Sequence, residues 1–406
     1  MTDDGSRSRT RRDVLKASGV LAATGLLAGC SGGSGEGTTG AGATESATDT
    51  EAAAASATES ASETEEGTEE AASGESYSVT MPPVGTIEFD GVPETWVANN
   101  GSWADMGVAL GQDPPKGVWL PSRYHTRYYD GIPDVSVDKS GMTALYSDGV
   151  SKEVFYELDG DVHVIDPNFL LNRFKGWEQA DVDEISNQVA PFFGNSIFST
   201  GYGWHESYPY LSLYEAFEKL SQVFQEQERY EAFASLHEQF QSNVSNVVPS
   251  SESERPAVAI LWPQPVDNPE TFSPYLIGEG TSFKQWRDLQ VRDALAETDV
   301  KDFHESRGEI DYETLLEVDP DVLLLRGNES KTAEEFQNTV VEYMKNQSVA
   351  SQLSAVQSGD VYRGGPLYQG PITNLVVTER AAKDLYGAEG QLFDRQRVSD
   401  IVNGNF

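Results

Sequence analysis

The chain has 406 residues, with 28 lysines and arginines against 66 aspartates and glutamates, and a formal net charge of −38. This length predicts two or three domains, or two lobes with tails. Nucleic-acid binding needs a basic surface, which this composition argues against. A single cysteine excludes a disulfide scaffold and a Cys-rich zinc or iron–sulfur site, and five scattered histidines argue against a multi-His metal site.

The acidity extends through the whole chain. Residues 1–76 hold 14 of the acids and five of the bases, so 52 acids and 23 bases follow, a charge of about −29. Only 11 of the 28 bases are lysine. The pattern predicts a protein adapted to high salt, where screening removes most of the self-repulsion. The alternative is an ordinary acidic secreted protein.

The N-terminus resembles an export signal. Arg11 and Arg12 precede a short apolar stretch, residues 19–29, and paired arginines in such a signal point to the twin-arginine route. The stretch is too short to span a bilayer of about 30 Å. It ends in LLAG before Cys30, which looks like a lipoprotein cleavage box. We expect residues 1–29 to be the signal, and Cys30 to be lipidated and anchored at the outer face of the cell membrane. A plain signal peptide with a chance cysteine is the alternative.

The segment after Cys30 has an extreme composition. Residues 31–76 contain only Gly, Ser, Thr, Ala, Glu and Asp. Such a segment cannot bury enough apolar surface to order itself, and its like charges favour extension. We expect residues 30–76 to form a disordered acidic tether.

The remainder contains one pattern twice. Residues 153–166, EVFYELDGDVHVID, and residues 313–326, ETLLEVDPDVLLLR, share five identities at a constant offset. Each copy predicts a short helix, a tight turn and a buried strand typical of a parallel sheet. Two distant copies indicate two α/β lobes of the same design. Coincidence between two common units is the alternative.

The other predicted elements fit around these copies. Apolar runs predict strands, and apolar residues at steps of three and four predict helices. In the first part of the chain we expect a strand at 95–98, a helix at 102–110, a strand at 117–120, a helix at 181–189 and a strand at 196–199. Two helices follow, at 211–224 and about 228–247. In the last part we expect a strand at 256–262, a helix at 312–317, a strand at 359–363 and a closing helix at 373–386. The fold is therefore α/β, with Rossmann-like lobes at 77–225 and 251–406 and a long interlobe helix within 226–250.

Two segments of the chain resemble a known family. Residues 310–325, IDYETLLEVDPDVLLL, and residues 359–362, GDVY, are similar to second-lobe segments of the substrate-binding proteins that deliver iron-siderophores, haem or cobalamin to ABC importers. The resemblance covers about residues 84–390. Residues 98–101, ANNG, depart from the Ser-Pro-rich loop usual in the first lobe, so the first-lobe ligand contacts are not carried over.

The resemblance implies a rigid interlobe helix, a ligand cleft between the lobes, no catalysis and no resident cofactor. It implies a lipid-anchored monomer that captures a ferric siderophore and delivers it to an ABC permease. Cobalamin, haem or a metal ion are alternative ligands, and a surface adhesin is an alternative class. An enzyme is disfavoured, because the chain lacks Gly-x-Ser-x-Gly, a phosphate-binding Gly loop and His-Glu-x-x-His.

Ligands of α/β lobes bind outside the carboxyl ends of strands. The candidate ligand-binding residues at these ends are Arg123, Tyr124, His125, Tyr202, Trp204, His205, Trp262, Arg326, Arg363 and Tyr368. Arginines and aromatic rings suit an anionic chelate with apolar arms. The alternative is a surface salt bridge for each base, and interlobe packing for Trp204.

Two further expectations concern single positions. His163 lies within a predicted strand and is expected to be a core histidine. Arg326 stands where the first copy has Asp166, so it is expected either to face the cleft and bind an anionic ligand or to pair with an acid such as Asp166. His125 and His205 are the only histidines expected near the cleft edge.

Overall fold

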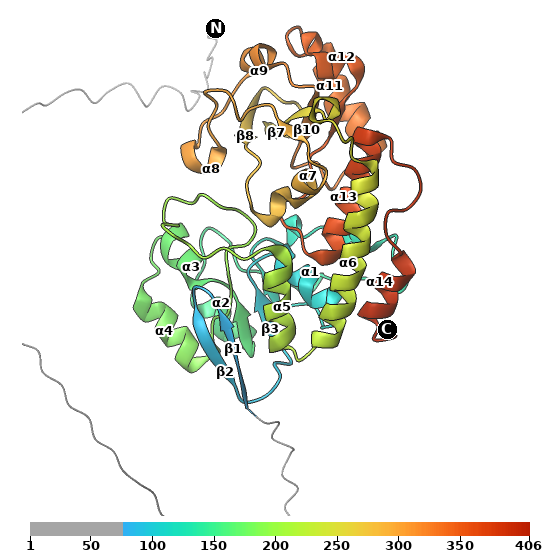
Figure 1. The fold of residues 1–406 in the computed structure, drawn as a ribbon. Coiled ribbons are helices and arrows are strands. Elements are labelled where there is room, and N and C mark those ends of the chain that lie inside the picture. The colour runs from blue at the N-terminus through green and yellow to red at the C-terminus, as the bar shows by residue number, and fades with distance from the viewer. Residues whose placement is uncertain (1–75) are drawn as a thin grey trace, which may run out of the picture. The chain divides into compact units, whose positions relative to one another are not determined.

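The computed structural model describes residues 76–406, which contain two α/β lobes linked by long helices (Figure 1). The expectations for the export signal, Cys30 and the tether lie outside these residues. Within residues 76–406 no helix combines the length and apolar character needed to cross a membrane.

The first lobe is built on short paired strands. β3 (Trp96–Ala98) runs parallel to β6 (Val162–Val164), and β4 (Gly117–Val118) runs parallel to β5 (Thr143–Ala144). An antiparallel hairpin of β1 (Tyr77–Met81) and β2 (Gly85–Phe89) precedes them. The helices of this lobe are α1 (Gly101–Ala109), η1 (Pro121–Arg123), η2 (Thr126–Tyr129), α2 (Glu153–Leu158), α3 (Pro167–Arg173) and α4 (Gln179–Gln188).

The second lobe has the larger sheet. Its order is β11 (Val361–Arg363), β10 (Val322–Leu325), β7 (Ala257–Gln264) and β8 (Thr271–Tyr275), with β9 (Arg292–Asp293) also pairing with β7. β8 alone is antiparallel to its neighbour. The helical segments around this sheet are η3 (Glu252–Glu254), η4 (Thr281–Phe283), α7 (Lys284–Asp288), α8 (Phe303–Ser306), α9 (Tyr312–Val318), α10 (Ala333–Phe336), η5 (Gln337–Val341), α11 (Glu342–Asn346), η6 (Ala350–Gln352) and α12 (Ser354–Ser358).

The predicted repeat is confirmed at the level of hydrogen bonds. Helices α2 and α9 both end at an aspartate with a left-handed backbone, at φ 45° and 43° respectively. Two residues later, Asp161 accepts from the backbone N–H of Thr95 at 2.7 Å, and Asp321 accepts from that of Ala257 at 2.7 Å. In each lobe an equivalent carboxylate therefore links the start of the motif's strand, β6 or β10, to the start of its parallel neighbour, β3 or β7.

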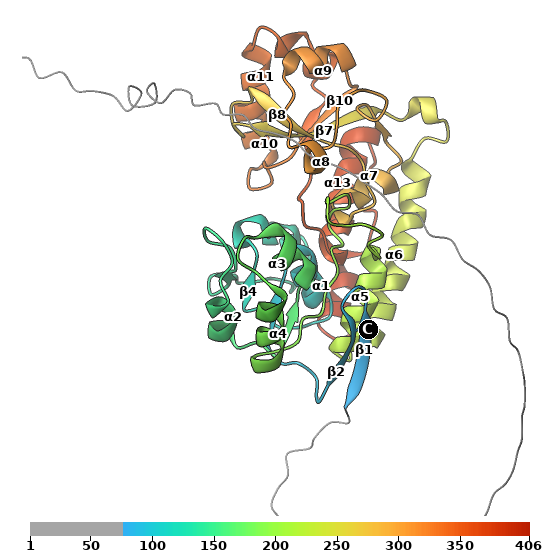
Figure 2. The same cartoon turned by 90° about the vertical axis from the view of Figure 1, so that its left-hand side faces the viewer.

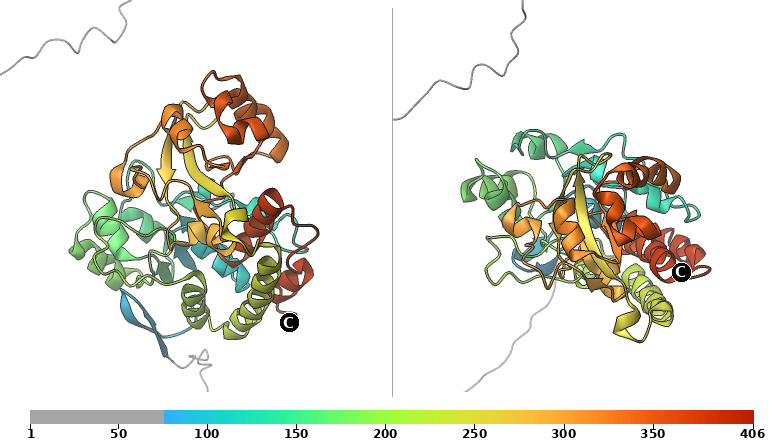
Figure 3. Two further views of the ribbon diagram at one scale, coloured as in Figure 1. Left: turned by 45° about the horizontal axis from the view of Figure 1, so that its top comes forward. Right: turned by 90° about the horizontal axis from the view of Figure 1, so that it is seen from above.

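Long helices run beside both lobes (Figure 2). These are α5 (Leu213–Val223), α6 (Gln227–Val247) and α13 (Pro371–Tyr386), and the chain closes with α14 (Arg395–Val402). One continuous apolar core extends from the first lobe through these helices to the second lobe, and it includes Trp103, Phe217, Phe240, Trp286 and Leu375. α13 packs against both α1 and α6, so the C-terminal part of the chain returns to the first lobe (Figure 3).

The structure differs from the sequence expectations in three places. Residues 196–199 form no strand; they are buried loop, and the backbone of Ile197 and Phe198 bonds instead to Thr281 and Ser282 of the second lobe. The β1–β2 hairpin and β8 were not predicted. α13 is not the closing helix, because α14 follows it. The predicted lobe boundaries stay predictions.

Candidate ligand-binding cleft

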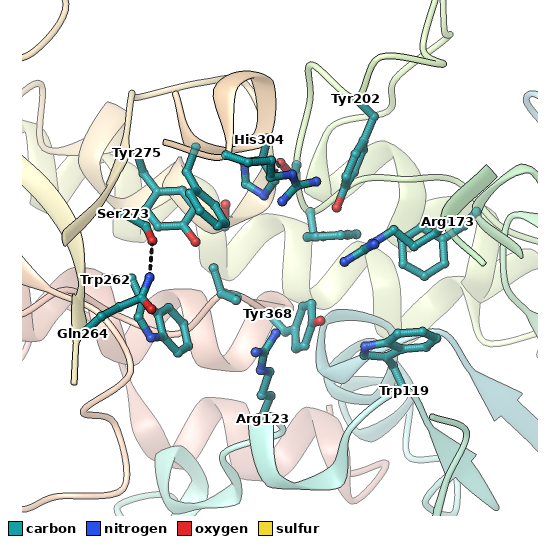
Figure 4. A pocket seen from close by; sticks show the side chains of 17 residues that line it. Trp119, Arg123, Arg173, Tyr202, Trp262, Gln264, Ser273, Tyr275, His304 and Tyr368 are labelled. Atoms are coloured by element: carbon teal, nitrogen blue, oxygen red, sulfur yellow. Dashed lines mark hydrogen bonds between the residues drawn. The ribbon is translucent and has the colours of Figure 1, made fainter. Parts of the chain in front are cut away.

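A cavity of about 300 Å³ lies between the two lobes (Figure 4). Both lobes line it, as the family resemblance implied. The first lobe provides Trp119, Arg123, Phe169, Arg173, Phe198, Ser199 and Tyr202; the second provides Trp262, Gln264, Ser273, Tyr275, Ser282, Phe303, His304, Arg307, Leu367 and Tyr368.

The charge of this lining is unusual for so acidic a chain. Three arginines, Arg123, Arg173 and Arg307, line the cavity, and no aspartate or glutamate does. Arg123 lies in η1, Arg173 ends α3, and Arg307 follows α8 in the opposite lobe. In the described part of the chain, none of the three forms a salt bridge. The cavity therefore carries positive charge that no salt bridge within residues 76–406 neutralises.

Aromatic rings hold these guanidinium groups. Arg123 lies over the ring of Trp262 at 5.3 Å, Arg307 over that of Phe303 at 5.2 Å, and Arg173 lies 6.0 Å from the ring of Phe174. Such contacts orient a guanidinium without satisfying its N–H donors or cancelling its charge. Figure 4 shows Arg123 and Arg173 reaching into the same space from different elements of the first lobe.

Three phenols complete the lining. Burial raises the pKa of Tyr202, Tyr275 and Tyr368, although neighbouring arginines of the cavity partly oppose this rise. The phenols are therefore neutral at ordinary pH and are able to donate hydrogen bonds to a ligand. Tyr202, Tyr368, Phe169 and Phe198 form one aromatic cluster that joins the lobes.

The second lobe adds a polar wall. Gln264 Nε2 donates to Ser273 Oγ at 2.8 Å, between β7 and β8. His304 Nδ1 lies 3.1 Å from Asp302 Oδ1, and Asp302 also accepts from the backbone of Leu276 at 3.0 Å. Burial alone would raise the pKa of Asp302, but these hydrogen bonds outweigh it and lower the pKa. Asp302 is thus ionised. It does not line the cavity itself, but it orients the ring of His304, which does.

Four of the predicted binding residues line the cavity: Arg123, Tyr202, Trp262 and Tyr368. Trp204 and His205 lie beside it. Trp204 stacks on the outer face of Tyr202 with ring centroids 4.4 Å apart, and His205 Nδ1 bonds to the hydroxyl of Tyr210. Burial lowers the pKa of His205 to about 4. These two residues support the loop that carries Tyr202.

Three other predicted residues lie away from the cavity. Tyr124 is buried in the core, where its hydroxyl lies 2.8 Å from that of Tyr129. His125 packs near Tyr128, and burial lowers its pKa. Arg363 donates to the backbone oxygen of Lys331 at 2.6 Å. His125 and Arg363 lie near the polar contact between η2 and the segment after β10, whereas Tyr124 turns into the first-lobe core beside α1.

The expectation that Arg326 faces the cleft is wrong. Arg326 is fully buried and does not line the cavity; its guanidinium lies 5.0 Å from the ring of Tyr275 and 4.5 Å from that of Phe283. Nη2 donates to the backbone oxygen of Ser282 at 2.7 Å, and burial lowers the pKa of Arg326 to about 10. It supports two lining residues, Tyr275 and Ser282, from behind.

The alternative pairing with Asp166 is also not observed. Asp166 accepts from the backbone of Asn168 at 2.9 Å at the start of α3 and from the hydroxyl of Tyr208. Among the described residues neither Asp166 nor Arg326 takes part in a salt bridge. His163 is fully buried, as expected of a core histidine, and burial lowers its pKa to about 4.

Sequence reasoning missed most of the lining. The unpredicted residues are Trp119, Phe169, Arg173, Phe198, Ser199, Gln264, Ser273, Tyr275, Ser282, Phe303, His304, Arg307 and Leu367. Trp119 and Ser199 lie at or next to the last residue of the predicted strands 117–120 and 196–199. The rule that ligands bind at strand ends could therefore have included them. His304 lies in α8, a four-residue helix with no periodic signal, and Arg307 directly follows this helix.

Within residues 76–406, no three His, Cys, Asp or Glu side chains gather as metal ligands. The cavity lies between two lobes and is lined by both of them, which is the arrangement of a two-lobed binding protein.

Comparisons with known proteins agree with this class. The family model described as "Periplasmic binding protein" matches residues 166–367. The matched residues run from the start of α3 to the segment before α13 and include every cavity-lining residue except Trp119, Arg123 and Tyr368. A search of curated proteins finds no match to the chain.

Solved structures show the same fold. A periplasmic binding protein from Veillonella parvula has 17% sequence identity and a TM-score of 0.53, covering 78% of this chain and 99% of its own. The petrobactin-binding protein YclQ from Bacillus subtilis has 15% identity and a TM-score of 0.52, covering 77% and 99%. An ABC-type Fe3+-hydroxamate transport system protein from Saccharomonospora viridis has 18% identity and a TM-score of 0.50, covering 77% and 99%.

Proposed function

We propose that this protein is an extracytoplasmic solute-binding protein that captures a ferric siderophore or a related iron chelate and delivers it to an ABC importer. The observation that carries the proposal is the interlobe cavity, with its three arginines and no carboxylate. Such a lining favours an anionic organic complex. Two proteins of the same fold are described as petrobactin-binding and as part of Fe3+-hydroxamate transport.

The polar groups of the cavity favour binding over catalysis. Ser199, His304 and Asp302 are the types of residue found in hydrolytic triads, but Ser199 Oγ lies 3.5 Å from both ring nitrogens of His304. The hydroxyl therefore faces the ring edge between the two nitrogens, whereas a nucleophile needs a short bond to one of them. No hydrolysis of a bound ester is expected.

A bare metal ion is a weaker candidate than a chelate. Transition-metal ions prefer histidine, cysteine or carboxylate ligands, and in residues 76–406 no such cluster of three occurs. Arginines would also repel a cation. Haem and cobalamin stay alternatives, to be separated from an iron chelate by mass.

The first test is to identify the natural ligand. The purified full chain is incubated with spent medium from iron-starved cells, washed and analysed by native mass spectrometry. We expect an iron-containing small molecule to be bound. Tyr202→Ala should reduce the amount recovered, because it removes a ring that belongs to both the cavity lining and the interlobe aromatic cluster. Recovery of cobalamin, of haem or of nothing would contradict the proposal.

The N-terminal segment predicts where in the cell the protein is located. We propose that the twin-arginine signal exports the protein and that Cys30 anchors it by lipid at the outer face of the membrane. Cys30→Ser is expected to move the protein from the membrane fraction to the medium or to leave it unprocessed. Arg11→Lys combined with Arg12→Lys is expected to block export instead. Unchanged membrane retention of Cys30→Ser would contradict the lipid anchor.

A further inference from the structure

We propose that the chelate is a ferric catecholate, whose negatively charged iron centre enters between Arg123, Arg173 and Arg307. This inference rests on the proposed function and adds the chemical class of the ligand. The charge, the rings and the hydrogen-bond donors of the cavity all favour this class.

The charge of the cavity favours a tris-catecholate over a tris-hydroxamate. Each catecholate group carries two negative charges, so three of them leave a ferric centre trianionic, whereas three hydroxamates leave it neutral. Three lining arginines with no lining carboxylate match a trianion, whereas a neutral complex would cover these arginines without supplying a counter-charge. The net charge of −38 repels anions at long range, so the attraction must come from these local groups.

The guanidinium groups of the cavity are already oriented before a ligand binds. Each lies near an aromatic ring, Trp262, Phe174 or Phe303, and none is held by a carboxylate in residues 76–406. A guanidinium supported in this way keeps its planar fork of N–H donors for a ligand. Paired catecholate oxygens on iron are close acceptors that suit such a fork.

Aromatic rings in the cavity favour catecholates over carboxylate-type chelates, which are also anionic. The cavity walls are rich in rings: Trp119 and Phe169 on the first lobe, and Trp262, Tyr275 and Phe303 on the second. Catechol rings stack on or pack edge-on against such walls, which the aliphatic arms of a citrate complex cannot do. The neutral phenols of Tyr202 and Tyr368 add donors to the catecholate oxygens.

The test is a comparison of three ferric complexes. Trp119 and Trp262 line the cavity, so tryptophan fluorescence reports occupancy. The full chain is titrated in molar NaCl with ferric enterobactin, a tris-catecholate, with ferrichrome, a neutral tris-hydroxamate, and with ferric citrate. We expect ferric enterobactin to bind about 100-fold more tightly than ferrichrome and about tenfold more tightly than ferric citrate.

Arginine variants assign the effect to the cavity. Arg123→Gln, Arg173→Gln and Arg307→Gln are each expected to weaken ferric enterobactin binding by about tenfold or more, while the weak ferrichrome binding hardly changes. Arg397→Gln, on α14 and outside the cavity, is the matched control and should bind like the parent chain. Melting curves of all four variants show whether each is folded.

The outcomes separate the inference from the proposed function. If ferrichrome binds as tightly as ferric enterobactin, or if folded arginine variants bind ferric enterobactin unchanged, the catecholate inference is overturned and the iron-chelate function stands. If ferric citrate binds tightest, the anionic class stands but the catecholate assignment is wrong. If none of the three ferric complexes binds, the proposed function itself fails.

Discussion

Glu329→Gln is expected to lower the free energy of unfolding by about 3 kcal/mol or more. Glu329 is 1% exposed, and Arg380 Nη1 of α13 lies 2.9 Å from its carboxylate. The backbone N–H of Gly365 also donates to it at 2.9 Å, as does the hydroxyl of Tyr128 in η2 of the first lobe. Neutralising the carboxylate leaves the half-buried Arg380 without its hydrogen-bonded counter-charge, which costs more than the pair itself contributes.

The same contact predicts a pH dependence. Burial would raise the pKa of Glu329, but the charge of Arg380 and the hydrogen bonds from Arg380 and Tyr128 outweigh it and lower the pKa to about 2. A carboxyl whose pKa is lower in the folded state stabilises the fold above its unfolded pKa, which is 4.5 here. That stability is lost as the pH falls from about 4.5 toward 2. Glu329→Gln should therefore be less stable at neutral pH and should show a weaker loss in this acid range.

Denaturant unfolding from pH 2 to 7 measures both effects. Glu334→Gln is a suitable control, because Glu334 is an exposed acid on α10 and its replacement should change stability by less than about 0.5 kcal/mol. The double variant Glu329→Gln with Arg380→Gln should lose less stability than the sum of the single variants, because each removes the other's partner. An unfolding midpoint of Glu329→Gln equal to that of the parent chain would contradict the prediction.

The second large effect is that of salt on folding. Residues after 76 carry about −29 charges, from 52 acids and 23 bases. At 0.1 M salt the screening length is about 10 Å and like charges repel across the surface, whereas at 1 M it is about 3 Å. We therefore propose adaptation to high salt and expect Tm to rise by more than about 10 °C between 0.1 M and 2 M KCl.

A charge variant tests whether repulsion causes this rise. Glu228, Glu231 and Glu238 are exposed acids on α6 and form no salt bridge within residues 76–406. Replacing all three by glutamine should raise Tm at low salt and flatten its salt dependence, because neighbouring like charges on a helix destabilise it. Thermal melts by circular dichroism in a KCl series measure this. A Tm of the parent chain that does not change with salt would refute the adaptation.

The sequence alone determined the two-lobed α/β design. The repeated helix–turn–strand pattern is visible because it depends on neighbours in the chain: a short amphipathic helix, an aspartate that tolerates a left-handed turn, and an apolar run. The same local logic located α6 within one residue of its start and identified the carboxyl ends of several strands. The strand-end rule then placed Arg123, Tyr202, Trp262 and Tyr368 near the ligand, and all four line the cavity.

Only the tertiary structure decided which arginines face the cleft. Arg326 and Arg123 are the same type of residue near strand ends, yet Arg326 turns back between Tyr275 and Phe283 while Arg123 reaches the cavity. Arg307 reaches the cavity from the residue after α8, a short helix that the sequence pattern does not predict. The direction of a side chain depends on contacts between segments far apart in sequence, and local periodicity carries no information about those contacts. The uncompensated charge of the cavity therefore emerges only when the two lobes come together.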